Sequence, residues 1–244
     1  MALGLLVPAF NEAAKIGAVL DAVPARVAEH DVTVIVVDDG STDGTAAVAA
    51  DKGATVHVQP ENGGKGLALR RGMDEAGELK LDALVWMDSD GQHRPEDLER
   101  IVRPILDGSA AMVVGSRYMS RSRSKAPLNR RLVRQATIEA IRHITGRSLT
   151  DPFSGYRAFS PEAVEAIELC GNQYESELEA LFCVSRAALP VLEVPIDRIY
   201  GPDTSKMGFH RGRILGRMAV MAGYVRTIRA AWSGKDERIR TTID

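Results

Sequence analysis

The stretch Val32-Thr33-Val34-Ile35-Val36-Val37-Asp38-Asp39-Gly40-Ser41 decides the fold. Its first six residues are all β-branched, which is typical of a strand buried on both faces of a parallel sheet. The run stops abruptly at two acidic residues, and residues 45–52 then have a helical pattern. This strand–loop–helix unit predicts an α/β fold whose ligands bind beyond the carboxyl ends of parallel strands.

Similar units recur along the chain. We expect further strands at residues 3–8, 55–58, 82–87, 111–114 and 192–199, with a loop or short strand at residues 151–159. We expect helices at residues 12–27, 67–76, 95–106, 132–144, 175–188 and 214–232, the first of them capped by Asn11. The pattern predicts a mostly parallel central sheet flanked by helices, with one domain at residues 1–210 and a helical extension at residues 211–244.

Composition narrows the class of protein. The chain has 244 residues, a formal net charge of −2 and 45% hydrophobic residues. These values indicate a globular protein and exclude a generally basic protein that coats nucleic acid. The two cysteines, Cys170 and Cys183, cannot form a disulfide framework or a cysteine-based zinc site, which favours a reduced, cytoplasmic setting. No uncharged apolar run is long enough to cross a bilayer, and we interpret residues 1–10 as a strand rather than a signal peptide.

The sharpest chemical feature is an Asp-Ser-Asp motif after the predicted strand 82–87. Its carboxylates, Asp88 and Asp90, are separated by one residue and can bind one hard cation. Oxygen ligands suit Mg²⁺ or Mn²⁺, which also binds substrate phosphates. Gln92 and His93 follow directly and could join or support the metal site. An isolated Asp-x-Asp is more often a turn or a helix cap, but the buried strand before it favours the metal.

Two other clusters lie at predicted strand ends. A carboxylate of Asp38 or Asp39 can accept a hydrogen bond from the ring N–H of uracil or guanine, while Ser41 or Asp43 would cap the next helix. The glycine-rich loop 62–66 is either a phosphate cradle or a plain turn.

A basic run extends over residues 117–134. Arg117 follows the strand 111–114, near the ligand edge of the sheet, and a guanidinium there can bind a phosphate with two hydrogen bonds. Residues 121–125 mix serine and arginine without aromatic residues, which is a poor platform for nucleic acid.

Taken together, these motifs resemble the family 2 glycosyltransferases, which have a glycosyltransferase-A-type fold. The resemblance is carried by residues 7–12 (VPAFNE), 37–41 (VDDGS), 64–66 (GKG), 88–93 (DSDGQH) and 114–118 (VGSRY). Within that family, the chain is most similar to the dolichyl-phosphate and polyprenyl-phosphate sugar synthases. The segments that support this similarity are residues 151–157 (DPFSGYR), 174–177 (YESE), 193–196 (EVPI) and 205–207 (SKM).

The resemblance implies a role for each matching residue. The nucleotide base and ribose would be held by Pro8, Ala9, Glu12 and Asp39, with Lys65 and Arg70 near the nucleotide. A Mg²⁺ or Mn²⁺ ion and the diphosphate would be held by Asp88, Asp90 and Gln92. Phosphates of donor or acceptor would be contacted by Arg117 and Arg131, and Lys206 would help to close the site.

The expected reaction is an inverting sugar transfer from a UDP- or GDP-linked sugar. A polyprenyl phosphate acceptor is already anionic at neutral pH, so it needs cations, for which the candidates are Arg117, Arg130, Arg131 and Lys206. A hydroxyl acceptor on a small molecule would need a general base, for which the candidates are Glu177, Glu175 and Asp151. A nucleotide-sugar-binding module without catalysis is a third hypothesis, and a nucleotidyltransferase has less support.

The end of the chain is basic and amphipathic. Residues 204–240 contain nine lysine and arginine residues and two acidic ones among regularly spaced apolar residues. A helix of this kind can lie on an anionic membrane surface, here the inner face of the membrane. The alternative is a helix packed on the domain itself or on a second subunit of a homo-oligomer.

Overall fold

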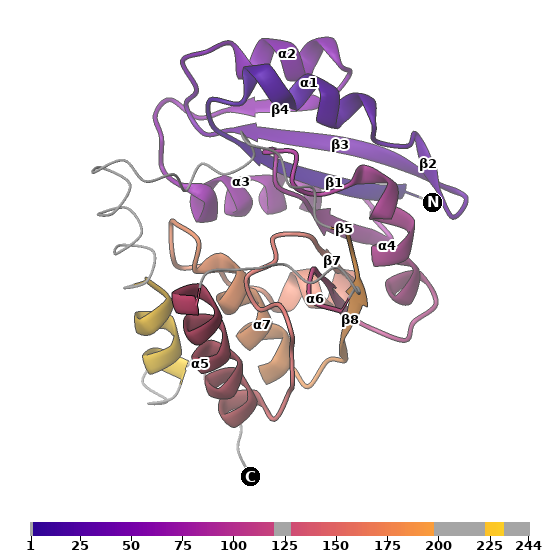
Figure 1. Cartoon of the computed structure of the whole chain (residues 1–244). Helices are drawn as coiled ribbons and strands as arrows, with labels where there is room; N and C mark the ends of the chain where they lie inside the picture. Colours follow the sequence, from indigo (N-terminus) through magenta and orange to yellow (C-terminus); the bar gives the residue numbers. More distant parts are fainter. Residues whose placement is uncertain (1, 120–127, 198–222, 232–244) are drawn as a thin grey trace.

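The computed structural model describes residues 2–119, 128–197 and 223–231, with the backbone alone at residues 128–131 (Figure 1). The described strands are β1 Ala2–Ala9, β2 Arg26–Val27, β3 His30–Asp38, β4 Thr55–Val58, β5 Ala83–Trp86, β6 Met112–Ser116, β7 Arg157–Phe159 and β8 Val191–Pro195. The helices are α1 Ala13–Asp21, α2 Thr45–Asp51, α3 Lys65–Gly77, α4 Leu98–Leu106, α5 Leu128–Thr145, α6 Pro161–Ala166 and α7 Ser176–Arg186, with a 3₁₀ turn η1 at Pro95–Asp97. Residues 223–231 are also helical.

The strands form one mostly parallel sheet, as predicted. Their order is β2-β3-β1-β5-β7-β6-β8, and β4 pairs with β3. Only β2 and β7 are antiparallel to their described neighbours. The carboxyl ends of β1, β3, β5 and β6 therefore lie along one edge of the sheet, where the polar clusters follow them.

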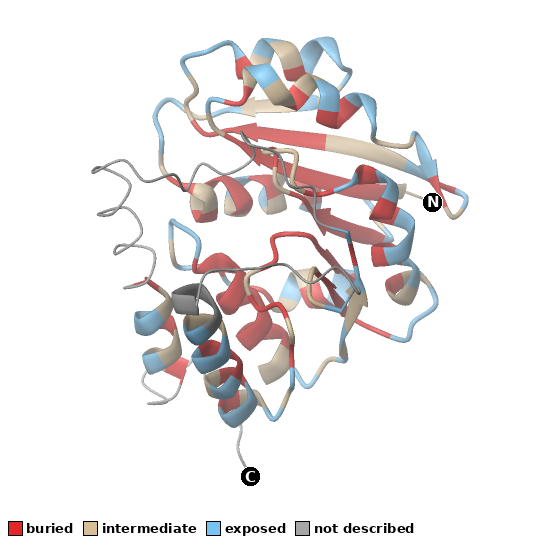
Figure 2. Ribbon diagram, in the orientation of Figure 1, coloured by how far each residue is buried: buried red, intermediate tan, exposed pale blue. Residues whose placement is uncertain are grey.

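Helices cover both faces of the sheet and create two hydrophobic cores. One core joins the sheet to α3, α5, α6 and α7, and the other joins it to α1, α2 and α4. The central strands are buried along most of their length (Figure 2). In β3, the β-branched residues Ile35, Val36 and Val37 are all buried, as expected for a strand covered on both faces.

The first helix is shorter than predicted. It ends at Asp21 rather than near residue 27, because Pro24 disfavours the helical conformation in the residue before it. Arg26 and Val27 instead pair with the start of β3. The predicted cap is wrong as well: Asn11 has a positive φ of 51° and its Oδ1 accepts the backbone N–H of Thr42 at 2.9 Å.

Strand β7 is the short strand allowed for residues 151–159, but its antiparallel position between β5 and β6 was not predicted, and neither was helix α6. Helix α6 starts at Pro161, and its first turn is capped by Ser160, whose Oγ accepts the N–H of Ala163 at 3.3 Å. The predicted helix 214–232 lies outside the described residues except for its segment 223–231.

Candidate active site

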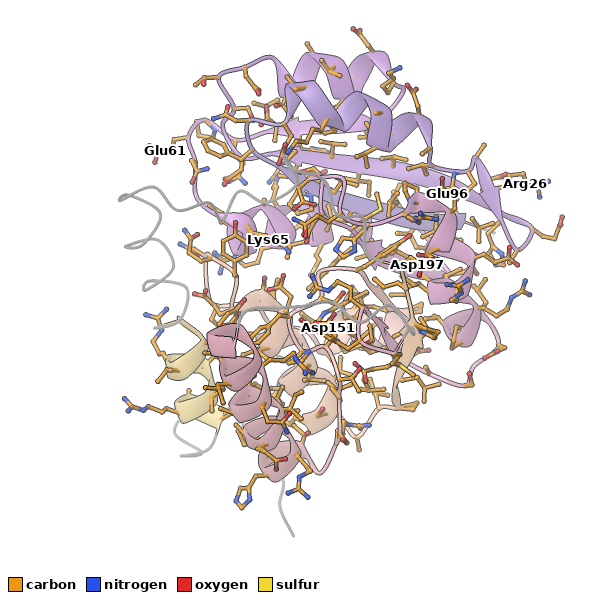
Figure 3. All side chains as sticks on the ribbon, in the orientation of Figure 1. Arg26, Glu61, Lys65, Glu96, Asp151 and Asp197 are labelled. Atoms are coloured by element: carbon orange, nitrogen blue, oxygen red, sulfur yellow. The ribbon has the colours of Figure 1, made fainter. Side chains whose placement is uncertain are left out.

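A partly buried lysine links the first motif acid to a second carboxylate. Asp88 follows β5, Lys65 is the first residue of α3, and Glu177 lies in the first turn of α7. The Lys65 Nζ atom lies 2.6 Å from Asp88 Oδ1 and 2.5 Å from Glu177 Oε1. On the other side of Asp88, His93 Nε2 lies 3.4 Å from Oδ2. Three elements that are distant in the sequence thus converge on one cation, whose position is labelled in Figure 3.

The charges in this cluster stabilise one another. Burial alone would lower the pKa of Lys65, but the carboxylates of Asp88 and Glu177 raise it well above its ordinary value. Burial would raise the pKa of Asp88, but Lys65 and then His93 hold it far below its usual range. Both groups are therefore ionised at neutral pH, as a cation-binding or phosphate-binding site requires.

The second motif acid has different surroundings. Asp90 accepts the backbone N–H of Gln92 at 3.0 Å and the side-chain Nε2 of Gln92 at 2.7 Å. Its pKa is raised, first by burial and then by the negative charge of Asp88. The predicted ligand Gln92 therefore orients Asp90.

These residues fit a Mg²⁺ or Mn²⁺ ion. Asp88 and Asp90 supply the oxygen donors that such ions prefer, and a divalent ion would relieve the repulsion between them. Within the described ranges, no three acidic, histidine or cysteine side chains converge to form a complete metal site. A Mg²⁺ ion held by one or two carboxylates characteristically completes its coordination with water and substrate phosphates.

The glycine-rich loop holds the start of α3. The backbone N–H groups of Gly63 and Gly64 both donate to the Asp39 carboxylate at 2.8 Å, and the N–H of Gly66 donates to the carbonyl of Asn172 at 2.9 Å. These three N–H groups already have protein acceptors, so the interpretation as a phosphate cradle is not supported. The loop instead determines where Lys65 enters the site.

The residues predicted to hold the nucleoside come together at the ends of β1 and β3. The N–H of Asp39 donates to the carbonyl of Ala9 at 2.8 Å, and the carbonyl of Pro8 accepts the Ser89 hydroxyl at 2.9 Å. Burial raises the pKa of Asp39, although its hydrogen bonds from the glycine loop oppose that shift. Glu12 is also buried, and its N–H donates to Thr45 Oγ1 at 2.9 Å.

The loop after β3 holds the starts of α1 and α2, although the N-cap residue of α2 is Gly44 and not Ser41 or Asp43. The Asp43 carboxylate accepts the N–H of Thr45, the first residue of α2, at 3.2 Å, and the N–H of Ala13, the first residue of α1, at 3.1 Å. The Ser41 hydroxyl instead accepts the N–H of Asn11 at 2.8 Å. Asp43 and Ser41 thus have structural roles, and so does Asp38, whose Oδ1 accepts the N–H of Ser41 at 3.0 Å.

Arg117 is paired with an acidic residue from a distant loop. Its Nε lies 2.6 Å from Asp151 Oδ2 and its Nη2 lies 2.8 Å from Asp151 Oδ1, so the guanidinium and the carboxylate share two hydrogen bonds. The backbone N–H of Arg117 also donates to Oδ2, at 3.1 Å. Burial would lower the pKa of Arg117, but Asp151 raises it above its ordinary value. This pairing uses two of the five guanidinium N–H donors.

The other predicted basic residues are placed differently. Arg70 donates to the carbonyl of Leu169 at 3.0 Å and to Asn172 Oδ1 at 2.5 Å, so it holds the loop that covers the start of α3. Arg131 lies in α5, but its side chain is outside the described structure, and Lys206 lies outside the described residues.

Two functional positions were not identified from the sequence. A Cβ atom added to Gly155 would lie 2.5 Å from Asp88 Oδ2, so only glycine allows the backbone to approach this carboxylate. Arg157 is fully buried and donates to the carbonyls of Pro152, Ser154 and Glu177 at 2.5–2.8 Å. Both belong to residues 151–157, a segment that had already been matched to the family from its sequence and that could have indicated these two positions.

The helix at residues 223–231 packs on the same domain. The ring of Tyr224 lies 4.8 Å from that of Phe153, Arg226 lies 3.3 Å from Glu175, and Ala231 belongs to the core next to α7. Among the helices that the structure describes, none has the length and apolar character needed to cross a membrane.

Comparison with known proteins gives a consistent result. The sequence pattern described as glycosyl transferase family 2 matches residues 5–167. The UDP-N-acetylglucosamine–dolichyl-phosphate N-acetylglucosaminyltransferase of Methanococcus voltae is 31% identical over 217 residues, covering 80% of this chain and 85% of that protein. The polyprenol monophosphomannose synthase of Mycolicibacterium smegmatis is 31% identical over 202 residues, covering 79% of this chain and 75% of that protein.

Solved structures agree with the fold. Glucosyl-3-phosphoglycerate synthase from Mycobacterium tuberculosis, in complex with Mn²⁺, UDP-glucose and phosphoglyceric acid, has a TM-score of 0.70 and 26% identity, covering 92% of this chain and 79% of that one. The chain has a mostly parallel sheet with an acidic pair after β5, and the family pattern matches two thirds of its length. The chain belongs to glycosyl transferase family 2.

Proposed function

We propose that this glycosyltransferase moves a sugar from a nucleotide-diphosphate sugar to a polyprenyl phosphate, with inversion at the anomeric carbon. The observation that carries the proposal is the position of Asp88, whose carboxylate contacts Lys65 and His93 beside Asp90 at the ligand edge of the sheet. Relatives that match four fifths of the chain are named for dolichyl phosphate and polyprenol substrates, which supports this acceptor class.

The donor would bind along the ends of β1, β3 and β5. Asp39, whose carboxylate accepts two loop N–H groups, retains acceptor capacity for a ring N–H of the base. Asp88 and Asp90 would hold Mg²⁺ or Mn²⁺, which when bound neutralises charge on the departing diphosphate. Lys65 keeps Asp88 ionised and in place. Gln92 donates a hydrogen bond to Asp90 and so fixes the orientation of its carboxylate.

The state of the candidate bases favours a phosphate acceptor. Each of the three carboxylates that could serve a hydroxyl acceptor is buried and lies beside a cation: Glu177 beside Lys65, Asp151 beside Arg117, and Glu175 beside Arg226. These ion pairs occupy carboxylate oxygens that a general base would need, and Arg117 engages both oxygens of Asp151. A phosphate acceptor is already ionised at neutral pH, so it needs no general base.

A second candidate is a small phosphorylated acceptor with a hydroxyl nucleophile. It is favoured by the solved neighbour that contains UDP-glucose and phosphoglyceric acid. Both candidates need cations near the acceptor, but only this one needs one of the paired carboxylates to release its cation and accept a proton.

Thermal shift and transfer assays on the full chain test the proposal. UDP and GDP would each be added with and without Mn²⁺, since a ligand that binds only the folded state raises the melting temperature. We expect a metal-dependent shift with one of the two nucleotides, and transfer of its labelled sugar to a short polyprenyl phosphate. Transfer to phosphoglycerate but not to the lipid would favour the second candidate. A metal-dependent shift without turnover on either acceptor would indicate a binding module.

We also propose a peripheral contact with the membrane surface. Leu132 on α5 is 63% exposed, and Val225 in the helix at residues 223–231 is 42% exposed and precedes the charged Arg226 in the sequence. Leu132→Glu should reduce flotation with anionic liposomes, whereas Leu79→Glu, at the end of α3, should not. Equal flotation of both variants would contradict this contact, and a change in oligomeric state would indicate a subunit interface instead.

A further inference from the structure

One carboxylate on the edge strand β8 holds the loop that carries Asp151. Glu193 Oε2 accepts the backbone N–H of Thr150 at 2.7 Å, and Oε1 accepts the backbone N–H of Asp151 at 2.9 Å. Hydrogen bonds to an ionised carboxylate are stronger than those between neutral groups. A single side chain therefore restrains two successive peptide groups that lie more than forty residues away in the sequence.

Thr150 is also held from two other elements, β6 and α5. The hydroxyls of Ser116, at the end of β6, and Thr150 lie 2.6 Å apart. Arg134 on α5 donates to the carbonyl of Thr150 at 2.8 Å, and its guanidinium carbon lies 4.1 Å from the centre of the Tyr118 ring. The loop is thus held to β6, β8 and α5 beside Asp151, which is labelled in Figure 3.

The orientation of Asp151 determines that of Arg117. The guanidinium is planar, so its two hydrogen bonds to one carboxylate fix its plane and the directions of its other three N–H groups. Glu193 itself is partly buried, and burial raises its pKa against the opposing effect of its two backbone hydrogen bonds. A half-buried carboxylate is costly unless it is hydrogen-bonded, as this one is.

We propose that Glu193 is a positioning residue, which acts through Asp151 to orient the Arg117 guanidinium toward a phosphate of the substrate. This inference rests on the proposed function, because it assumes that Arg117 contacts a phosphate during sugar transfer. Both oxygens of Glu193 are directed to the loop, so it does not need to touch the substrate to affect the reaction.

The variant Glu193→Gln tests this role. It keeps the size of the side chain but removes its charge and directs an NH₂ group at one of the two backbone N–H groups. We expect faster hydrogen exchange at the Thr150 and Asp151 amides, and a fall in kcat/KM for the acceptor of about 10- to 100-fold, as for a displaced positioning group. The affinity for the nucleoside diphosphate should be unchanged. Glu99→Gln, on the exposed surface of α4, removes the same charge and should change none of these values.

A double-mutant cycle separates positioning from a general loss of stability. If Glu193 acts through Arg117, then Glu193→Gln lowers kcat/KM no further in the Arg117→Ala background. Additive losses would overturn the inference, and so would unchanged kcat/KM in the single variant. If the wild-type protein transfers no sugar to any acceptor, the proposed function fails. Amide exchange then still tests whether Glu193 holds the loop that carries Asp151, because unchanged exchange in Glu193→Gln would show that it does not.

Discussion

Replacing Gly155 with alanine tests the geometry of the site directly. The added Cβ would lie 2.5 Å from Asp88 Oδ2 and 2.7 Å from Oδ1, whereas ordinary contacts begin at 3.4 Å. The carboxylate or the backbone must therefore move by about 0.9 Å to restore a normal contact. Lys65 at 2.6 Å and His93 at 3.4 Å hold Asp88 from other directions, so this movement disturbs the charge cluster.

A displacement of this size should affect the rate more than the stability. Misplacing a group by about 1 Å in an active site can cost about 100-fold in rate, so we expect kcat/KM to fall by about one to two orders of magnitude. Overpacking costs about 1–3 kcal/mol in the free energy of unfolding, so the variant should still fold. The assays are transfer of labelled sugar and urea unfolding of the same preparations.

Two other glycines supply matched controls. A Cβ at Gly77, at the end of α3, has no atom within 4 Å, so Gly77→Ala should keep the wild-type rate. A Cβ at Gly4 would lie 2.5 Å from Leu81 Cδ1, at the other end of β1 from the site. Gly4→Ala should therefore lose stability without a comparable loss of rate. The reasoning is refuted if Gly155→Ala retains wild-type kcat/KM, or loses no more than Gly4→Ala.

Three further variants test charged side chains: two lie in the site, and the third is Glu179 on α7, whose carboxylate accepts the N–H groups of Cys170 and Gly171. Lys65→Met leaves the carboxylates of Asp88 and Glu177 without their shared cation, so the free energy of unfolding in urea should fall by about 3–5 kcal/mol; a fall below about 1 kcal/mol would contradict the bridge. Asp90→Ala should abolish Mn²⁺-dependent transfer, and near-normal turnover would remove Asp90 from the metal site. Burial is the chief cause of a raised pKa at the Glu179 carboxyl, whose ordinary pKa is 4.5. The protonated carboxyl therefore stabilises the folded state fully below pH 4.5, and this stabilisation is lost as the pH rises through the raised pKa. Glu179→Gln should therefore gain stability relative to wild type over that pH range, and a constant difference would contradict the shift.

Local sequence patterns determined the ligand edge of the sheet. A strand buried on both faces needs an unbroken apolar run, and β3 has one that ends where Asp38 and Asp39 begin. The carboxyl ends of parallel strands share an edge, so the positions of Asp39, Asp88 and Arg117 followed from strand order along the chain. The family motifs were also recognisable, because each is a short continuous segment.

Only the tertiary structure decided how these residues are paired. Lys65, Asp88 and Glu177 come from three elements, and their ionic contacts depend on how α3 and α7 pack against β5. Strand β7 is antiparallel between β5 and β6, and the loop before it places Gly155 against Asp88 and carries the partner of Arg117.

The difference has a simple physical basis. Hydrophobic periodicity reports which residues of one element face the core, because that depends only on the repeat of the helix or strand. Periodicity carries no information on which distant side chain forms an ion pair with a buried charged group. Glu193 illustrates the limit: its burial and its two hydrogen bonds exist only because β8 pairs with β6, beside the loop that contains Asp151.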